Sequence, residues 1–274
     1  MLASPLLFTK GEIKVSVLTF AMWLTDMAPD WMQNLPEWLQ RLCFQFFQVF
    51  VYENRWKFFT DGLVTTFVVT IGALILGVII GMIVAILRSA HDSSRKKPNI
   101  ILRILNSICK IYVTVLRGTP LMVQLLIMGF VIMVPKSTFD TNLCAIITLG
   151  INSGAYVAEI ARSGLMSIPA GQTEAGRSLG LSYAQTMFYI IVPQAFKNIL
   201  PALGNELIAL LKETSLVTVI ALQDVTKAAQ VIVSKTYTAT IPYISLALIY
   251  LVLVVILTKL LGILERRLRE SDKR

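Results

Sequence analysis

The feature that most constrains this chain is an uncharged, strongly apolar run over residues 62–87. About 20 consecutive apolar residues are enough for a helix to cross a lipid bilayer, and this run has 26. A second uncharged run, of 23 residues, covers 236–258. Charged residues make up only 15% of the 274-residue chain, against about 25% in an average soluble domain. The sequence therefore predicts an all-α integral membrane protein.

Three further segments are apolar enough to span a bilayer, although they contain proline, glycine or charged residues. Transmembrane helices tolerate such residues where neighbouring protein or trapped water satisfies the freed backbone groups. The five spans are expected at about 60–87, 104–135, 141–163, 186–211 and 238–261. Within the second of them, Pro120 should kink the helix. Arg117 either extends to the headgroups or lines a solute pathway.

The distribution of Lys and Arg over the connections predicts how the chain is oriented. One set of connections holds 13 of these residues and comprises 88–103, 162–187 and 259–274. The opposite set holds 6 and comprises 53–61, 136–140 and 212–235. Cytoplasmic loops of membrane proteins are the more basic ones. We therefore expect the first set, which includes the C-terminus, to be cytoplasmic.

The first 55 residues differ from the rest of the chain in their aromatic content. All four tryptophans lie near this end: Trp23, Trp31, Trp38 and Trp56. The stretch WLQRLCFQFFQVFVYENRW has helically spaced aromatic residues and is typical of an amphipathic helix in the headgroup region. The predicted organisation is an interfacial extension over 1–55, a membrane domain over 56–265 and a basic tail over 266–274. Whether residues 13–28 form an extra span or an uncleaved signal segment stays open.

Several classes of function lack the residues they need. Cys43, Cys109 and Cys144 are odd in number and have no CxxC spacing, so neither a structural disulfide nor a metal site is expected. No GxxxxGK[ST] motif occurs, so the chain has no P-loop for ATP. Its basic residues lie in short loops rather than on one solvated face, which argues against nucleic acid as a partner.

The connection between the third and fourth spans carries helix signals of its own. Pro169 suits the first turn of a helix, and Gly180 suits the left-handed residue that ends it. Ser182 and Gln185 have the spacing of a capping box for a second helix, which should end at Pro193. The sequence predicts a short folded helix on the cytoplasmic membrane surface.

The small residues of this helix suggest a surface that a partner can approach closely. Ala170, Ala175 and Gly176 leave parts of it without side chain, and Glu174 and Arg177 offer polar contacts. The alternative is a well-capped loop helix that has no partner.

Four segments resemble those of one known family, the permeases of ABC transporters. EAGRSLG at 174–180, followed after nine residues by IIVP at 190–193, resembles the EAA loop, written E-A-A-x3-G-x9-I-x-L-P. Gly176 replaces the second Ala of that pattern, and Val192 replaces the Leu. The other three segments, RGTPLMVQ at 117–124, GAYVAEIAR at 154–162 and KETSLV at 212–217, resemble permeases that import histidine, arginine, glutamine and related amino acids. The resemblance covers about residues 55–265.

This resemblance implies a fold, a set of partners and a set of coupling residues. The expected fold is that of type I importer permeases, with a cytoplasmic coupling helix, in a bacterial cytoplasmic membrane. The implied partners are a second permease chain, two ATPase subunits that bind ATP and Mg, and an extracytoplasmic binding protein that delivers the amino acid. The chain itself is then not an enzyme. The coupling residues would be Glu174, Ala175, Gly176, Arg177, Gly180 and Pro193.

Glu159 is the strongest candidate for contact with the solute. An ionisable residue within a span is costly and is a functional candidate by default. Asn152 and Tyr156 lie seven and three residues before it, on the same helix face. The carboxylate could accept the ammonium group of an amino acid; alternatively, it pairs with Arg162 or with another helix. The presence of Glu159 together with a complete-looking EAA-like loop favours a homodimer over a heterodimer.

Other residues in the spans are weaker candidates. Gly150, Ser153 and Gly154 could let the third span unwind and expose backbone groups to a solute. Thr70, Thr214 and Ser215 could also contact it, although hydroxyls in membrane helices often bond to their own backbone. The last set, Gly72, Gly77 and Gly81, is predicted to serve helix packing.

Two other classes of function remain as alternatives. An intramembrane serine protease needs a histidine base, and the only histidine, His91, is expected in a basic loop. An ATP-independent secondary transporter or channel would carry internal repeats and several intramembrane acids, and the sequence analysis identifies neither.

Overall fold

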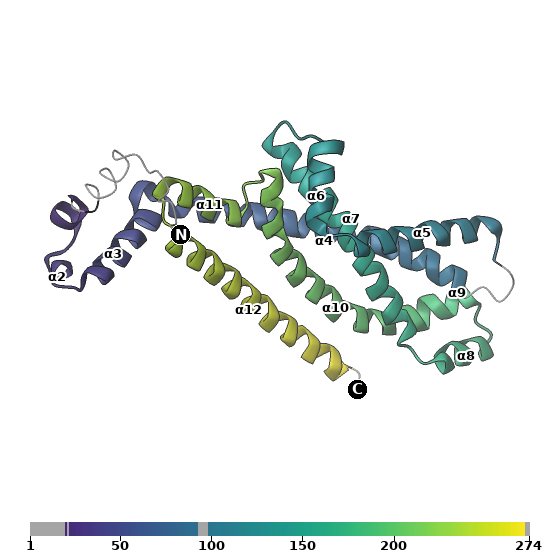
Figure 1. The fold of residues 1–274 in the computed structure, drawn as a ribbon. Coiled ribbons are helices and arrows are strands. Elements are labelled where there is room, and N and C mark those ends of the chain that lie inside the picture. Colours follow the sequence, from purple (N-terminus) through teal and green to yellow (C-terminus); the bar gives the residue numbers. More distant parts are fainter. Residues whose placement is uncertain (1–19, 21, 93–97, 272–274) are drawn as a thin grey trace, which may run out of the picture.

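The computed structural model describes residues 20, 22–92 and 98–271, and all regular elements within these ranges are helices (Figure 1). In the labels, α denotes an α-helix and η a π-helical or 3₁₀ turn. The elements before the first span are η1 (Trp23–Met27), α2 (Asp30–Gln33), α3 (Glu37–Phe46), η2 (Phe47–Val51) and η3 (Tyr52–Asn54). The next are α4 (Trp56–Asp92), α5 (Ile100–Gly118), α6 (Leu121–Ile127), η4 (Met128–Ile132) and α7 (Thr138–Met166). The last are α8 (Ala170–Ser178), α9 (Tyr183–Thr186), η5 (Met187–Ile191), α10 (Val192–Glu213), η6 (Thr214–Ile220), α11 (Val225–Thr236) and α12 (Thr240–Ser271).

The described helices accommodate the five expected spans. Three of them, α4, α7 and α12, are each long and apolar enough to cross a membrane. The second span corresponds to α5 with α6 and η4, bent by 105°, and the fourth corresponds to the helices from α9 to η6 with α11, bent by 49°. The loop expected at 88–103 starts later than predicted, because α4 continues through Asp92 and includes His91. Residues 13–19 and part of the tail lie outside the described residues.

Small residues bring α4 and α7 into the most extensive helix contact of the described structure. A Cβ added at Gly81 would lie 2.6 Å from the Val157 side chain, and one at Gly77 would lie 2.9 Å from the Ser153 hydroxyl. On α7, a Cβ at Gly150 would lie 2.8 Å from Leu76. Close approach at glycine is how membrane helices gain van der Waals contact. The predicted packing role of Gly72, Gly77 and Gly81 is confirmed.

The close α4–α7 contact predicts opposite outcomes for two substitutions of equal size. Gly81→Ala is expected to destabilise the chain by about 1–3 kcal/mol, the usual cost of overpacking a tight contact. Gly262→Ala adds the same methyl group to α12, where no atom lies within 4 Å of it. It is expected to leave stability unchanged or slightly raised, because alanine favours helix. Thermal unfolding in detergent measures both; equal melting temperatures for the two variants would contradict the packing role.

The second span is broken, rather than kinked, at Pro120. Thr119, which precedes this proline, is extended (φ −115°, ψ 142°), as residues before proline prefer to be. The Gln124 amide donates to the Leu116 and Thr119 carbonyls at 2.9 and 3.1 Å. Asn152 of α7 donates to Leu116 and to the Gln124 side chain at 3.2 and 3.0 Å. These amides satisfy the backbone groups that the break frees, which allows a sharp bend within the membrane domain.

The helix that was expected to end at Pro193 instead continues beyond it. A π-helical turn, η5, ends at Ile191, and Pro193 occupies the first turn of α10. Proline is tolerated there because the amide of a first-turn residue has no regular partner in its own helix. The chain therefore runs as successive helical segments from α9 to Glu213. The α8–α9 loop lies at one end of the molecule, and α2 and α3 lie at the opposite end (Figure 1).

Candidate functional site

A cavity of about 490 Å³ lies between α7 and α10. Seven residues line it: Tyr156, Ile160, Ala202, Asn205, Glu206, Ala209 and Glu213. The two glutamates are seven residues apart on α10 and therefore share one face of that helix. Two carboxyl groups and an amide from α10, together with a phenol from α7, therefore line a single cavity.

Ser153 holds one of the two cavity glutamates. Its hydroxyl, 1% exposed, donates to Oε1 of Glu206 at 2.7 Å. Hydrogen bonds to a carboxylate are among the stronger side-chain hydrogen bonds. They also restrict the rotamers of a long side chain, whose conformational freedom is otherwise lost on binding. The contact orients Glu206 before any ligand arrives.

A guanidinium group lies against the cavity wall at Tyr156. The Arg117 carbon Cζ lies 5.1 Å from the centre of the Tyr156 ring, within the range of cation–π contacts. Arg117 thus contacts a residue of the cavity wall. The cavity can therefore offer acceptors for ammonium or guanidinium groups, with one cation near its edge.

Glu159 does not line this cavity, because it forms an ion pair with Arg88 of α4. Arg88 and Glu159 side chains are 11% and 30% exposed. Nearby, Arg162 lies 3.8 Å from Asp92, which joins the same two helices a second time. Of the two sequence interpretations, the structure favours pairing with another helix, and the partner is Arg88 rather than Arg162.

The Arg88–Glu159 pair predicts strong non-additivity between substitutions. Arg88→Met or Glu159→Leu alone leaves one charge half-buried without its partner, and each should cost about 3 kcal/mol. The double variant should cost less than the sum, by about 1–3 kcal/mol, because neither charge remains. Urea or thermal unfolding of the four proteins in detergent gives the coupling. Additive losses would mean that the pair does not stabilise the α4–α7 contact.

The remaining sequence candidates bond within the protein. Asn152 is buried, and its amide donates to the Gln124 side chain beside the break at Pro120. Tyr156 lines the cavity, and Ser153 contributes to it only through its hydrogen bond to Glu206. The Thr70 hydroxyl donates to a carbonyl of its own helix, and those of Thr214 and Ser215 donate to carbonyls in the last turn of α10, all at 2.7–2.8 Å. The third span is not unwound at the residues that could allow it: α7 is continuous, and its Gly150 and Gly154 pack on α4 and α5.

Sequence reasoning missed Glu206 and Glu213, although a signal was present. Glu206 lies inside the fourth expected span, so the rule that selected Glu159 also applied to it. Its helical neighbour Glu213 follows at a spacing of seven.

The predicted loop helix forms as α8, with the caps that the sequence indicated. Gly180 is left-handed (φ +82°), its amide donates to Arg177, and the Leu181 amide donates to Gly176. These two bonds are those of a Schellman motif. Ser182 and Gln185 form the capping box that starts α9. Pro169 precedes α8 as its N-cap instead of occupying its first turn.

One of the predicted coupling residues faces inward. Gly176 is buried, and a Cβ on it would lie 2.7 Å from the Thr186 side chain. Gly176 therefore serves the packing of α8 on the following helix, and its surface is unavailable to a partner. Glu174, Ala175 and Arg177 are exposed. Gln194 of α10 donates to Gln172 of α8 at 3.3 Å and adds a second connection between them.

Comparison with known proteins agrees with this architecture. Residues 77–270 match the family described as binding-protein-dependent transport system inner membrane component. The arginine transport system permease protein ArtQ of Bacillus subtilis is 39% identical over 216 residues, 78% of this chain and 94% of that protein. The glutamine transport system permease protein GlnP of Escherichia coli is 38% identical over 170 residues, 61% of this chain and 77% of that protein.

Two solved structures are similar as well. A crystal structure of an amino acid ABC transporter with histidines has a chain that is 41% identical, with a TM-score of 0.69 over 77% of this chain and 94% of that one. A chain of the MetNI methionine ABC transporter in an inward-facing conformation has a TM-score of 0.64 at 19% identity and shows the shared fold alone; it covers 80% of this chain and 99% of that one. This chain thus belongs to the family of binding-protein-dependent transport system inner membrane components.

Proposed function

We propose that the chain is the membrane-spanning permease subunit of an ATP-driven amino-acid importer, and that the α7–α10 cavity holds the amino acid during transport. The observation that carries the site is the placement of Glu206 and Glu213 in one cavity of the membrane domain. An acid in a span is costly unless it serves a pathway or a partner. The relatives named for arginine and glutamine transport support an amino acid as the solute.

The chemistry of the cavity favours a cationic amino acid. Such a solute carries an α-ammonium group and a second positive group on its side chain, and the cavity has two carboxyl groups to accept them. Its α-carboxylate would lie towards Arg117, which stacks on Tyr156 at the cavity edge. A neutral amino acid would leave one of the two acids unpaired. Burial without a partner disfavours a charged group.

The partners follow from the family and from the shape of α8. Its exposed residues Glu174, Ala175 and Arg177 would contact a separate ATPase subunit on the cytoplasmic side, which binds ATP and Mg. An extracytoplasmic binding protein would deliver the solute at the opposite face. A second copy of this chain would complete the pathway, since one chain carries both cavity acids and a fully capped loop.

Reconstitution with candidate partners tests this function. The chain would be co-purified with a candidate ATPase and a candidate binding protein, and ATP hydrolysis would be measured in proteoliposomes with each amino acid. The expected result is a stable complex whose ATPase activity rises most with arginine, lysine or histidine. Uphill uptake by the chain alone, driven by an ion gradient, would instead establish a secondary transporter. A complex stimulated only by neutral amino acids would support the assignment as an importer and overturn the proposed preference for cationic amino acids.

A further inference from the structure

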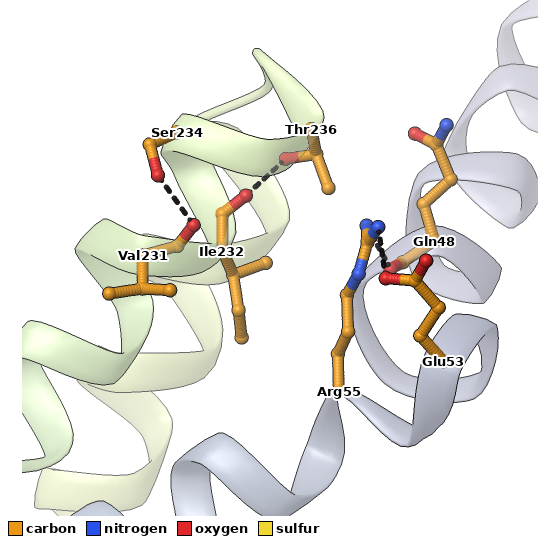
Figure 2. A network of polar contacts seen from close by, with 7 residues as sticks. All are labelled: Gln48, Glu53, Arg55, Val231, Ile232, Ser234 and Thr236. Atoms are coloured by element: carbon orange, nitrogen blue, oxygen red, sulfur yellow. Dashed lines mark hydrogen bonds and ion pairs between the residues drawn. The ribbon is translucent and has the colours of Figure 1, made fainter.

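The segment before the first span is folded and attached to the membrane domain. Val49 of η2 is fully buried in a cluster with Phe59 of α4 and Ile232 of α11. Arg55, 7% exposed, donates to the Gln48 carbonyl and to the Glu53 carboxylate, each at 3.1 Å. Figure 2 shows these groups beside the last turns of α11. This attachment fixes the segment at the end of α4 and α11.

Within this segment, α3 presents three different faces. Its inner face carries Phe44, which is buried, with its ring 5.4 Å from that of Trp23. A second face carries Glu37 and Arg41, spaced by four residues, and the two form an ion pair at 2.6 Å. Residues four apart on a helix form one stripe. The segment therefore has a packed face and a polar face.

The third face of α3 is apolar and largely exposed, although the Phe46 ring lies 4.8 Å from the Phe50 ring of η2. Trp38, Leu42 and Phe46 form a stripe next to the polar one, and they are 63%, 37% and 54% exposed. The same end of the molecule exposes Trp56, 45%, at the start of α4. The stripe is therefore apolar like the outer surface of the first span, α4, where isoleucines and valines are exposed.

We infer that α3 lies in the membrane interface, with the Trp38–Leu42–Phe46 stripe inserted at the boundary between lipid headgroups and acyl chains. A span whose outer surface is apolar has lipid around it, and α3 lies where that span ends. Tryptophan is enriched at this depth because its ring is apolar and its N–H is polar. The adjacent Glu37–Arg41 pair, whose side chains are 71% and 64% exposed, then faces water, as the polar side of an interfacial helix does.

The position of the tryptophans makes this inference directly measurable. All four tryptophans of the chain lie at or before position 56, so tryptophan emission, excited at a wavelength that tyrosine does not absorb, reports on this region alone. Variants would retain one tryptophan each, at position 23, 38 or 56, with phenylalanine at the other three. Each would be reconstituted in vesicles of a zwitterionic lipid, with or without bromine on the acyl chain near the headgroup. Aqueous iodide serves as the second quencher.

The Trp38-only variant should lose at least as large a fraction of its emission to brominated lipid as the Trp56-only variant. The Trp23-only variant is the matched control, because Trp23 is 5% exposed and should lose the least. If replacing Trp23 unfolds the segment, the quenching of Trp38 by brominated lipid is obtained instead as the difference between wild type and Trp38→Phe. Emission from Trp38 that iodide quenches and brominated lipid leaves unchanged would overturn the inference. It would indicate a water-exposed face that is free for a protein partner.

Discussion

Glu206→Gln is expected to abolish transport of a cationic amino acid while the permease still assembles with its ATPase. The substitution keeps the shape of the side chain and its contact with Ser153 but removes the charge. Loss of one desolvated charge partner costs about 3 kcal/mol, and a cost of about 3 kcal/mol weakens binding on the order of 100-fold. Uptake of labelled solute into proteoliposomes measures transport. Basal ATP hydrolysis and gel filtration measure assembly.

The control for this prediction is Glu265→Gln, which makes the same chemical change on α12, away from the cavity. It should leave uptake unchanged. Ser153→Ala should have a smaller effect than Glu206→Gln, because it removes only the donor that orients the carboxylate. Wild-type uptake by Glu206→Gln at solute concentrations below saturation would remove the α7–α10 cavity from the pathway. The assignment of an importer would stand.

A second large effect is expected at α8, where Glu174→Lys should separate ATP hydrolysis from transport. Glu174 is exposed, and nothing in the described chain holds it, so reversing its charge leaves the fold intact and alters a contact with a partner. Gly180→Val acts through the backbone instead. A left-handed residue with a side chain costs about 1–2 kcal/mol, and a β-branched one distorts the end of α8. Both variants should retain ATPase activity and lose most of the solute uptake that depends on it.

The matched control in α8 is Gly171→Ala. A methyl group added there meets no atom within 4 Å, and the residue has no left-handed backbone. Its ratio of solute transported to ATP hydrolysed should equal that of wild type. A normal ratio in both Glu174→Lys and Gly180→Val would show that α8 does not couple the two processes.

The sequence could predict those elements whose signals are local. Runs of apolar residues identify spans because a bilayer offers no partner for exposed backbone. The left-handed Gly180 and the Ser182–Gln185 box were correct because each depends on only a few adjacent residues. Gly77 and Gly81 were recognised as packing sites for a similar reason, since small residues on one helix face have few other uses in a membrane.

Two of the outcomes that the sequence did not predict concern which residues meet across helices. Nothing near Glu159 in the sequence shows that Arg88, 71 positions away, reaches it. Gly176 was taken for bare outer surface, but Thr186 of the next helix covers it. Pro193 was taken for a helix end, although a proline in the first turn after a π-helical turn is compatible with continuation. The cavity depends on the rotation of α10 against α7, which periodicity within one helix cannot fix.

Because α9, η5 and α10 follow one another without a break, the α8–α9 loop and the cavity lie along one helical rod. Gly176 contacts this rod at Thr186, near its start, and Gln172 contacts it at Gln194; Glu206 lies about 30 Å beyond Thr186, at 1.5 Å per residue. Between Thr186 and Glu206, Ile199 of α10 packs against α7 at Gly164, which has no side chain. This close contact is a point about which the rod could tilt. The loop arm, from Thr186 to Ile199, is about twice the length of the cavity arm, from Ile199 to Glu206. A tilt about this point would therefore move Glu206 opposite to α8 by about half as far.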